Sequence, residues 1–176
     1  MKLFVDTGSI KDIEAIAALG ILDGVTTNPS LLAKETGDYR QNLKRICDIV
    51  KGPVSGEVTA TDFAGMMRQG HDLAEIDEHI IVKVPLTRDG IRACKAMSTE
   101  GIRVNVTLVF SAAQAPLAAK AGATFVSPFV GRLDDVATNG MELIREIVEI
   151  YDNYQFAGAG YCVGTDGRRY MQLFVR

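Results

Sequence analysis

The stretch Ile80-Ile81-Val82-Lys83-Val84-Pro85 is a short aliphatic run that contains a single charge. An unbroken apolar run of this length is typical of a strand buried on both faces, as in a parallel sheet covered by helices, and such a strand seldom admits a charge. Burial disfavours the ammonium form of an amine, and the free amine is the form that attacks a carbonyl carbon to give a Schiff base. Lys83 is therefore a candidate nucleophile. The alternative is a strand-end lysine whose amine reaches water.

Five further apolar runs have the same character, and a segment with helical periodicity follows each of them. These runs cover residues 3–5, 21–26, 53–58, 103–109 and 123–129. Alternating strands and helices predict a parallel sheet with crossover helices, and a closed barrel of this kind has eight such units. Six units are complete by about residue 152. We therefore expect an α/β fold of the TIM (β/α)8-barrel type, truncated to about six units and followed by a divergent tail.

The chain changes character after residue 156. Residues 157–176 contain four glycines and no helical stripe, and they are too few for two further units of about 25 to 30 residues each. The pair Asp166-Gly167 separates residues 161–163 from the alternating residues 170–175, a pattern typical of a β-hairpin. We expect residues 1–156 to form the barrel units and residues 157–176 a tail that is a hairpin or disordered, which leaves the barrel incomplete.

The composition argues against several classes of function. A net charge of −3, without clusters of lysine and arginine, leaves no basic surface for nucleic acid or an anionic membrane. The N-terminus soon reaches Asp6, and no run of about 18 apolar residues occurs, so we expect neither a signal peptide nor a membrane span. The scattered Cys47, Cys94 and Cys162 form no C-x-x-C pair, which indicates reduced thiols and no structural metal. We expect a cytoplasmic protein whose partners are small molecules or other subunits.

Polar residues fall at the same end of each apolar run. In a parallel barrel the carboxyl ends of the strands form one rim, and active sites of such barrels lie there. Period-two alternation places Asn105 and Thr107 on one face of their strand. Taken singly, such residues are also typical of helix caps, turns, solvated strand ends or satisfied core amides, but their recurrence on six strands indicates a catalytic rim. The rim residues are Asp6, Thr26, Asn28, Glu57, Lys83, Asn105, Thr107, Ser127 and Arg132.

The residue types at this rim indicate aldol chemistry without a cofactor. A lysine that forms a Schiff base turns a bound ketone into an electron sink, so that the bond between its alpha and beta carbons can break or form. Asp6 and Glu57 supply two carboxylates, one for the proton of the breaking carbinol and one for the water of imine formation. Asn28 and Asn105 offer amides for substrate hydroxyls, and Arg132 offers a forked donor for phosphate. The combination predicts an aldol enzyme that acts on phosphorylated sugars.

With these residues in place, the chain resembles the small-subunit transaldolases, a family that also includes the fructose-6-phosphate aldolases. The resemblance covers residues 1 to about 155, and the tail does not match. The matching stretches are Leu3-Phe4-Val5-Asp6-Thr7, Gly24-Val25-Thr26-Thr27-Asn28-Pro29-Ser30, Val82-Lys83-Val84-Pro85, Asn105-Val106-Thr107-Leu108-Val109-Phe110 and Ser127-Pro128-Phe129-Val130-Gly131-Arg132-Leu133-Asp134-Asp135.

The resemblance implies a role for each rim residue. Lys83 would be the Schiff-base lysine, Asp6 the acid and base of carbon–carbon cleavage, and Glu57 with Thr107 the handlers of the catalytic water. The substrate would be bound by Thr26, Asn28, Asn105 and Ser127, with Arg132 at its phosphate. The implied function is transfer of a dihydroxyacetone unit between sugar phosphates of the pentose phosphate pathway, such as fructose 6-phosphate, erythrose 4-phosphate and sedoheptulose 7-phosphate, by a homo-oligomer.

Two alternatives stay open beside transaldolase. One is a fructose-6-phosphate aldolase, but that branch of the family carries glutamine where this chain has Glu57 and tyrosine where it has Phe129, and both departures favour transaldolase. The other is a catalytically inactive truncated barrel with only a structural or interaction role, since the tail does not match the family.

Overall fold

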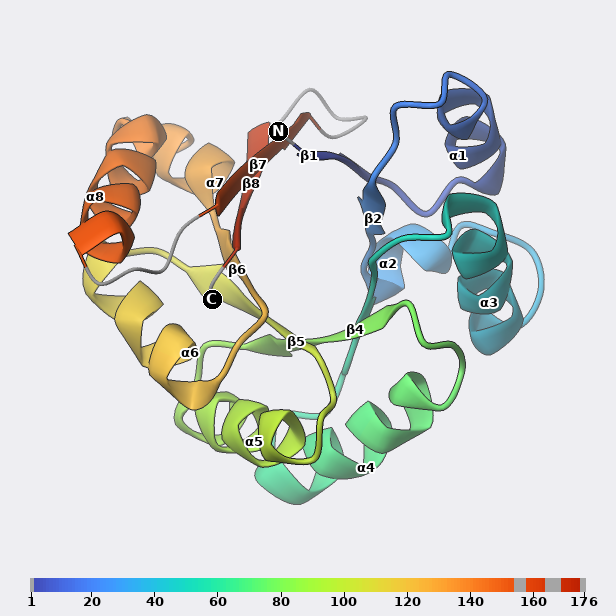
Figure 1. The fold of residues 1–176 in the computed structure, drawn as a ribbon, viewed down its shortest axis with the longest axis horizontal. Coiled ribbons are helices and arrows are strands. Elements are labelled where there is room, and N and C mark those ends of the chain that lie inside the picture. The colour runs from blue at the N-terminus through green and yellow to red at the C-terminus, as the bar shows by residue number, and fades with distance from the viewer. Residues whose placement is uncertain (1, 154–157, 164–168, 175–176) are drawn as a thin grey trace.

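A computed structural model of the chain describes residues 2–153, 158–163 and 169–174, and it has a ring of strands with helices around it (Figure 1). Six strands lie side by side in chain order and run parallel to one another. They are β1 (Lys2–Asp6), β2 (Gly24–Thr26), β3 (Val54–Glu57), β4 (Ile80–Pro85), β5 (Val104–Val109) and β6 (Phe125–Pro128). The alternating α/β fold class predicted from the sequence is thereby confirmed.

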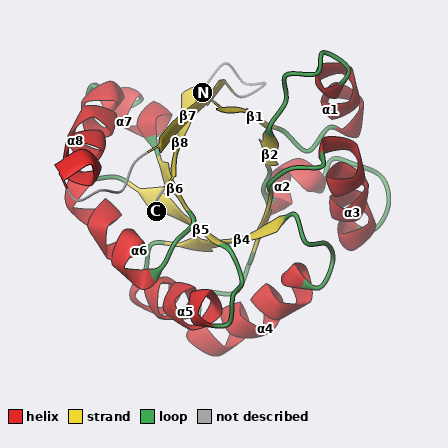
Figure 2. Ribbon diagram, in the orientation of Figure 1, coloured by secondary structure: helices red, strands yellow, loops and turns green. Residues whose placement is uncertain are grey.

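Helices cover the outside of this ring (Figure 2). Their starts follow local sequence signals: the side chains of Ser9, Asp38, Asp62 and Thr87 each accept a hydrogen bond from a backbone N–H of the first turn. The helices are α1 (Ile10–Ala17), α2 (Pro29–Leu32), α3 (Tyr39–Val50), α4 (Phe63–Ala74), α5 (Arg88–Thr99), the 3-10 turn η1 (Ala112–Gln114), α6 (Ala115–Ala121), α7 (Val130–Asp134) and α8 (Gly140–Asn153).

The last two strands complete the ring, and no helix follows either of them within the described residues. β7 (Gly158–Val163) and β8 (Arg169–Phe174) pair antiparallel, and the ring then runs β1-β2-β3-β4-β5-β6-β8-β7. β7 lies parallel to β1 and β8 antiparallel to β6. The described residues thus contain six strand–helix units followed by two strands, and these strands close the edge that six units alone would leave open. The turn expected at Asp166-Gly167 lies outside the described residues.

Strand alternation gives the barrel two separate apolar layers. Val82 and Val84 of β4 belong to the main core between strands and helices, whereas Ile81 forms a second buried cluster with Phe4 and Phe125. The Phe4 and Phe125 rings meet edge to face, with their centroids 6.0 Å apart. This second cluster fills the interior of the barrel toward the amino ends of the strands, and it leaves the opposite end for polar side chains.

One glycine fixes the helix that follows the strand of Lys83. A Cβ atom added at Gly90 would clash with the carbonyl oxygen of Pro85 at the end of β4. The Gly90 N–H also donates to the Thr87 hydroxyl, which caps α5, at 3.0 Å. The absence of a side chain therefore lets α5 begin close against the end of β4.

The two described cysteine side chains, Cys47 and Cys94, are free and buried. Burial raises the pKa of both thiols to about 12, so both are protonated and unreactive at neutral pH. None of the helices within the described ranges is long and apolar enough to cross a membrane. No group of histidine, cysteine, aspartate and glutamate side chains gathers there as a metal site would require.

The turn between α4 and β4 is held by one carboxylate. Asp77 Oδ1 accepts a hydrogen bond from the backbone N–H of His79 at 2.9 Å and lies 2.7 Å from His79 Nδ1. Asp77 Oδ2 lies 3.0 Å from Lys44 Nζ of α3. The His79 N–H above all, then the His79 ring and Lys44, hold the pKa of Asp77 well below its usual range against the raising effect of burial. The ionised carboxylate is therefore the form that stabilises the fold.

We expect Asp77→Asn to lower the free energy of unfolding at pH 7 by about 1 to 2 kcal/mol, because an amide accepts these hydrogen bonds more weakly than a carboxylate. The difference from the wild type should shrink as the pH falls below about 4, where Asp77 of the unfolded chain takes up a proton while the folded protein still keeps the carboxylate ionised. Urea unfolding of both proteins between pH 7 and pH 3 measures this. Asp72→Asn, on the exposed side of α4, is the matched control and should leave stability unchanged. A difference that stays constant with pH would contradict the account.

Candidate active site

The rim residues predicted from the sequence lie at the carboxyl ends of adjacent strands. Strand pairing sets Glu57 of β3 beside Lys83 of β4, and Lys83 in turn beside Asn105 of β5. The same register sets Asp6 beside Thr26, and Thr107 beside Ser127. Side chains two residues apart on a strand share a face, so these groups line the interior of the barrel above the layer of Phe4, Ile81 and Phe125.

Lys83 is the charged group at the centre of this set. Only 8% of the residue is exposed, and its Nζ lies 3.1 Å from Glu57 Oε2. The same Nζ donates to the backbone carbonyl of Thr27 at 3.4 Å. The Lys83 amine is therefore held between a carboxylate and a carbonyl inside the barrel. Glu57 is close enough to take a proton from the ammonium and return it.

The second carboxylate has a different partner. Asp6, the last residue of β1, accepts a hydrogen bond of 2.8 Å from the Thr26 hydroxyl. Thr26 is buried, and its hydroxyl also lies 3.4 Å from the carbonyl oxygen of Val5. A hydroxyl that donates to a carboxylate fixes its orientation. Asp6 and Glu57 thus have separate environments, one beside a hydroxyl and one beside an amine, which suits two different proton transfers.

Asn105 is fully buried and held from two sides. Its Nδ2 donates to the Ser55 hydroxyl of β3 at 3.3 Å, and its Oδ1 accepts from the Ser127 hydroxyl of β6 at 2.9 Å. Sequence reasoning missed Ser55, because a serine inside an apolar run carries no signal except that it stands two residues before Glu57, on the same face of the strand.

Two buried hydroxyls have unused hydrogen-bonding capacity. Within the described part of the chain, neither Thr27 Oγ1 nor Thr107 Oγ1 has a hydrogen-bond partner. A buried hydroxyl without a partner costs about 1 to 3 kcal/mol, and such atoms indicate a place where water or a ligand binds. Thr107 precedes Leu108, which has a φ of +62°, and the β5–β6 register shifts between Thr107 and Val109. A bulge of this kind re-aims the end of a strand.

Asn28 and Arg132 are less closely joined to this group. Asn28 caps α2, with its Oδ1 accepting from the Leu31 N–H at 3.0 Å, so its Nδ2 is the part left for a ligand. Arg132 of α7 is exposed over 56% of its side chain and lies 3.5 Å from Asp135. Its side chain is therefore largely in contact with solvent.

Sequence reasoning also missed Tyr39 of α3. The Tyr39 hydroxyl donates to the backbone carbonyl of Glu57 at 3.5 Å. Burial raises the pKa of Tyr39, and the Glu57 charge adds to this effect, while the hydrogen bond opposes it. The phenol therefore stays protonated and supports the end of β3 from the helix layer.

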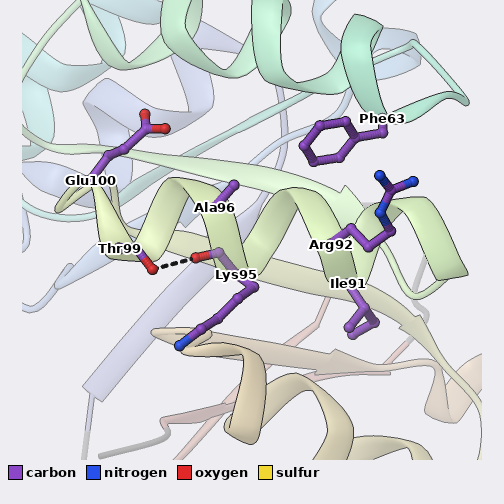
Figure 3. Close-up of a pocket in the computed structure, with 7 residues that line it drawn as sticks. All are labelled: Phe63, Ile91, Arg92, Lys95, Ala96, Thr99 and Glu100. Carbon is purple, nitrogen blue, oxygen red and sulfur yellow. Dashed lines mark hydrogen bonds between the residues drawn. The ribbon is translucent and has the colours of Figure 1, made fainter.

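A surface hollow between α4 and α5 lies apart from the rim. Figure 3 shows its side chains along α5, with Phe63 from the start of α4 near Arg92. The Arg92 guanidinium lies 4.5 Å from the centre of the Phe63 ring, a cation–π contact. The hollow is lined by Phe63, Ile91, Arg92, Lys95, Ala96, Thr99 and Glu100, and it contains none of the candidate active-site residues.

Comparison with known proteins gives one family. A family model described as "Transaldolase/Fructose-6-phosphate aldolase" matches residues 3–166, farther than the limit of about 155 expected from the motifs. A protein named "Probable transaldolase" from Kosmotoga olearia is 54% identical over 156 residues, which are 89% of this chain and 72% of the relative. Proteins of the same name from Hyphomonas neptunium and Sinorhizobium medicae are each 60% identical over 156 residues, with the same coverage.

Proposed function

The chain belongs to the transaldolase/fructose-6-phosphate aldolase family, and we propose that it is a transaldolase that transfers a dihydroxyacetone unit between sugar phosphates through a Schiff base on Lys83. The observation that carries this proposal is the contact of 3.1 Å between the buried Lys83 amine and Glu57. A buried amine with a carboxylate as its proton partner has what imine formation needs.

The reaction begins when Lys83 releases its proton to Glu57 and attacks the ketone carbon of a ketose phosphate. The carbinolamine then loses its hydroxyl as water, with a proton returned from Glu57, and leaves a protonated imine. Thr107, with its unpartnered hydroxyl, offers that water a hydrogen bond. The imine is the electron sink for the next step.

Cleavage needs a base on the other side of the substrate. Asp6 takes the proton of the hydroxyl on the beta carbon, the bond between the alpha and beta carbons breaks, and the electron pair moves into the imine to give an enamine. The shortened aldose phosphate leaves. An acceptor aldehyde then enters, the enamine attacks it, and Asp6 returns its proton to the new hydroxyl. Water finally hydrolyses the imine and frees Lys83, so that every proton and electron pair is returned.

The remaining rim residues bind substrate in this proposal. Asn105 and Ser127 form one hydrogen-bonded pair at the level of Lys83 and suit the hydroxyls next to the ketone. Thr26 and Asn28 add polar groups from the β2 end. Arg132 lies 3.5 Å from Asp135, a long contact that can be exchanged for one with a phosphate group. A guanidinium group binds phosphate in a forked geometry.

The proposal extends to cellular context and assembly. The substrates are fructose 6-phosphate, erythrose 4-phosphate and sedoheptulose 7-phosphate, which places the reaction in the pentose phosphate pathway of the cytoplasm. A homo-oligomer is supported by large apolar side chains that are exposed on the single chain, since such groups are often covered by a neighbouring subunit. They include Leu19 (66% exposed), Ile21 (56%) and Val136 (69%).

We expect the protein to convert fructose 6-phosphate and erythrose 4-phosphate into glyceraldehyde 3-phosphate and sedoheptulose 7-phosphate. The measurement follows glyceraldehyde 3-phosphate by a coupled reduction, with and without the acceptor. Release of free dihydroxyacetone from fructose 6-phosphate alone measures the competing aldolase reaction and should be the slower of the two. A folded protein that only cleaves fructose 6-phosphate would be an aldolase, and a folded protein with neither activity would be an inactive barrel; either result contradicts the proposal.

A further inference from the structure

Ser55 belongs to a hydrogen-bonded chain in the interior of the barrel, on the side of Lys83 toward the amino ends of the strands. Ser55 pairs with Ile81 on the neighbouring strand, whereas Asn105 on the other side of β4 pairs with Lys83. The bond between the Ser55 hydroxyl and Asn105 Nδ2 therefore spans the inner face of β4, between Ile81 and Lys83. Ser55 is 3% exposed and Asn105 is fully buried, so water does not compete for this bond.

We propose that Ser55 is a positioning residue that fixes the Asn105 amide for the donor sugar; this inference rests on the proposed transaldolase function. An amide carries a donor and an acceptor on groups of nearly equal size, and rotation by half a turn exchanges them. Ser127 alone holds only the Oδ1 end of the amide and leaves the amide plane free to tilt about that one contact. A second contact, from Nδ2 to the Ser55 hydroxyl of β3, holds the other end and so fixes the plane of the amide.

The fixed orientation determines what Asn105 can offer a substrate. One hydrogen of Nδ2 is directed to Ser55, so the other hydrogen remains as a donor for a substrate oxygen. Oδ1 is directed to Ser127 and keeps one lone pair. In this arrangement Ser55 never touches the substrate, and it acts only through Asn105.

Replacing Ser55 by alanine should raise the KM for fructose 6-phosphate by about three- to tenfold, the worth of one hydrogen bond. The KM for erythrose 4-phosphate and the borohydride-trapped fraction at saturating donor should stay unchanged. In an Asn105→Ala background, the same change should have no further effect on the donor KM, because the group that Ser55 holds is gone. Ser98→Ala is the matched control, since the Ser98 hydroxyl donates to the Ala121 carbonyl at 2.9 Å in the helix layer; it should leave both KM values unchanged.

A readout independent of activity keeps this test separate from that of the proposed function. The Asn105 side-chain amide, assigned by its disappearance in Asn105→Ala, should give one sharp pair of nitrogen–proton NMR signals in the wild type. In Ser55→Ala these signals should shift and exchange faster with solvent. Ser55→Cys, which keeps nearly the same volume and is a weaker hydrogen-bonding group, should give smaller shifts and serves if the alanine variant does not fold.

Failure of the positioning role of Ser55 and failure of the proposed transaldolase function give different results. Unchanged Asn105 signals in the Ser55 variants, or an equal loss of donor binding with and without Asn105, would overturn the positioning role. A wild type without transfer activity whose Asn105 signals still depend on Ser55 would overturn the proposed function and leave the positioning role supported.

Discussion

Replacing Lys83 by methionine is expected to lower kcat/KM for transfer by at least about 10³-fold, because methionine keeps the length of the side chain and removes the amine that forms the covalent intermediate. The protein should still fold, since methionine has a similar length and suits the buried strand β4. Steady-state kinetics with fructose 6-phosphate and erythrose 4-phosphate measure the loss.

Lys95→Met is the matched control for this experiment. Lys95 lies on α5 at the surface hollow, away from the rim, so its replacement should leave kcat/KM within about twofold of the wild type, as for a surface change of less than about 0.5 kcal/mol. If the Lys83 variant retains a tenth of the wild-type rate, Lys83 is not the nucleophile.

Glu57→Gln is expected to reduce transfer by about 10²-fold while direct aldol cleavage falls less. An amide cannot cycle a proton to the water of imine formation, and general acid–base groups are typically worth about 10² to 10⁴ in rate. The variant keeps the shape of the side chain beside Lys83 but loses the ion pair at 3.1 Å. Parallel assays of glyceraldehyde 3-phosphate formation with acceptor and of dihydroxyacetone release without it give the ratio.

The same substitution at Glu75, an exposed carboxylate at the end of α4, controls for the change of charge and should alter neither rate. Equal losses of transfer and cleavage in Glu57→Gln would mean that the carboxylate does not direct the reaction. A wild type that already prefers direct cleavage would also mean that the Glu57 carboxylate does not direct the reaction toward transfer.

Much of the fold could be predicted because strands and helices have local signals. The aliphatic run around Lys83 predicts a strand buried on both faces, and β4 has this burial. Period-two alternation predicts that Asn105 and Thr107 share a face, and both are buried polar groups on β5. The carboxyl ends of parallel strands meet at one rim whatever the details of packing, so candidate residues from distant parts of the chain could be grouped without coordinates.

The contacts across the barrel could not be predicted in this way. The bond between Ser55 and Asn105 joins residues 50 positions apart on strands that are not neighbours, and it depends on the stagger of the strands, which no local pattern encodes. The same holds for closure of the ring, because pairing of β8 with β6 and of β7 with β1 is set by the geometry of the completed sheet.

The measurement that tests the central claim most directly is reductive trapping of the covalent intermediate. The protein is incubated with fructose 6-phosphate and sodium borohydride, digested, and mapped by peptide mass spectrometry. We expect a single substrate-dependent adduct, with the mass of a reduced dihydroxyacetone or hexose phosphate imine, on the peptide that contains Lys83, and none on that peptide in Lys83→Met. An adduct on another lysine of folded, active protein, or active protein that forms no adduct, would contradict this expectation.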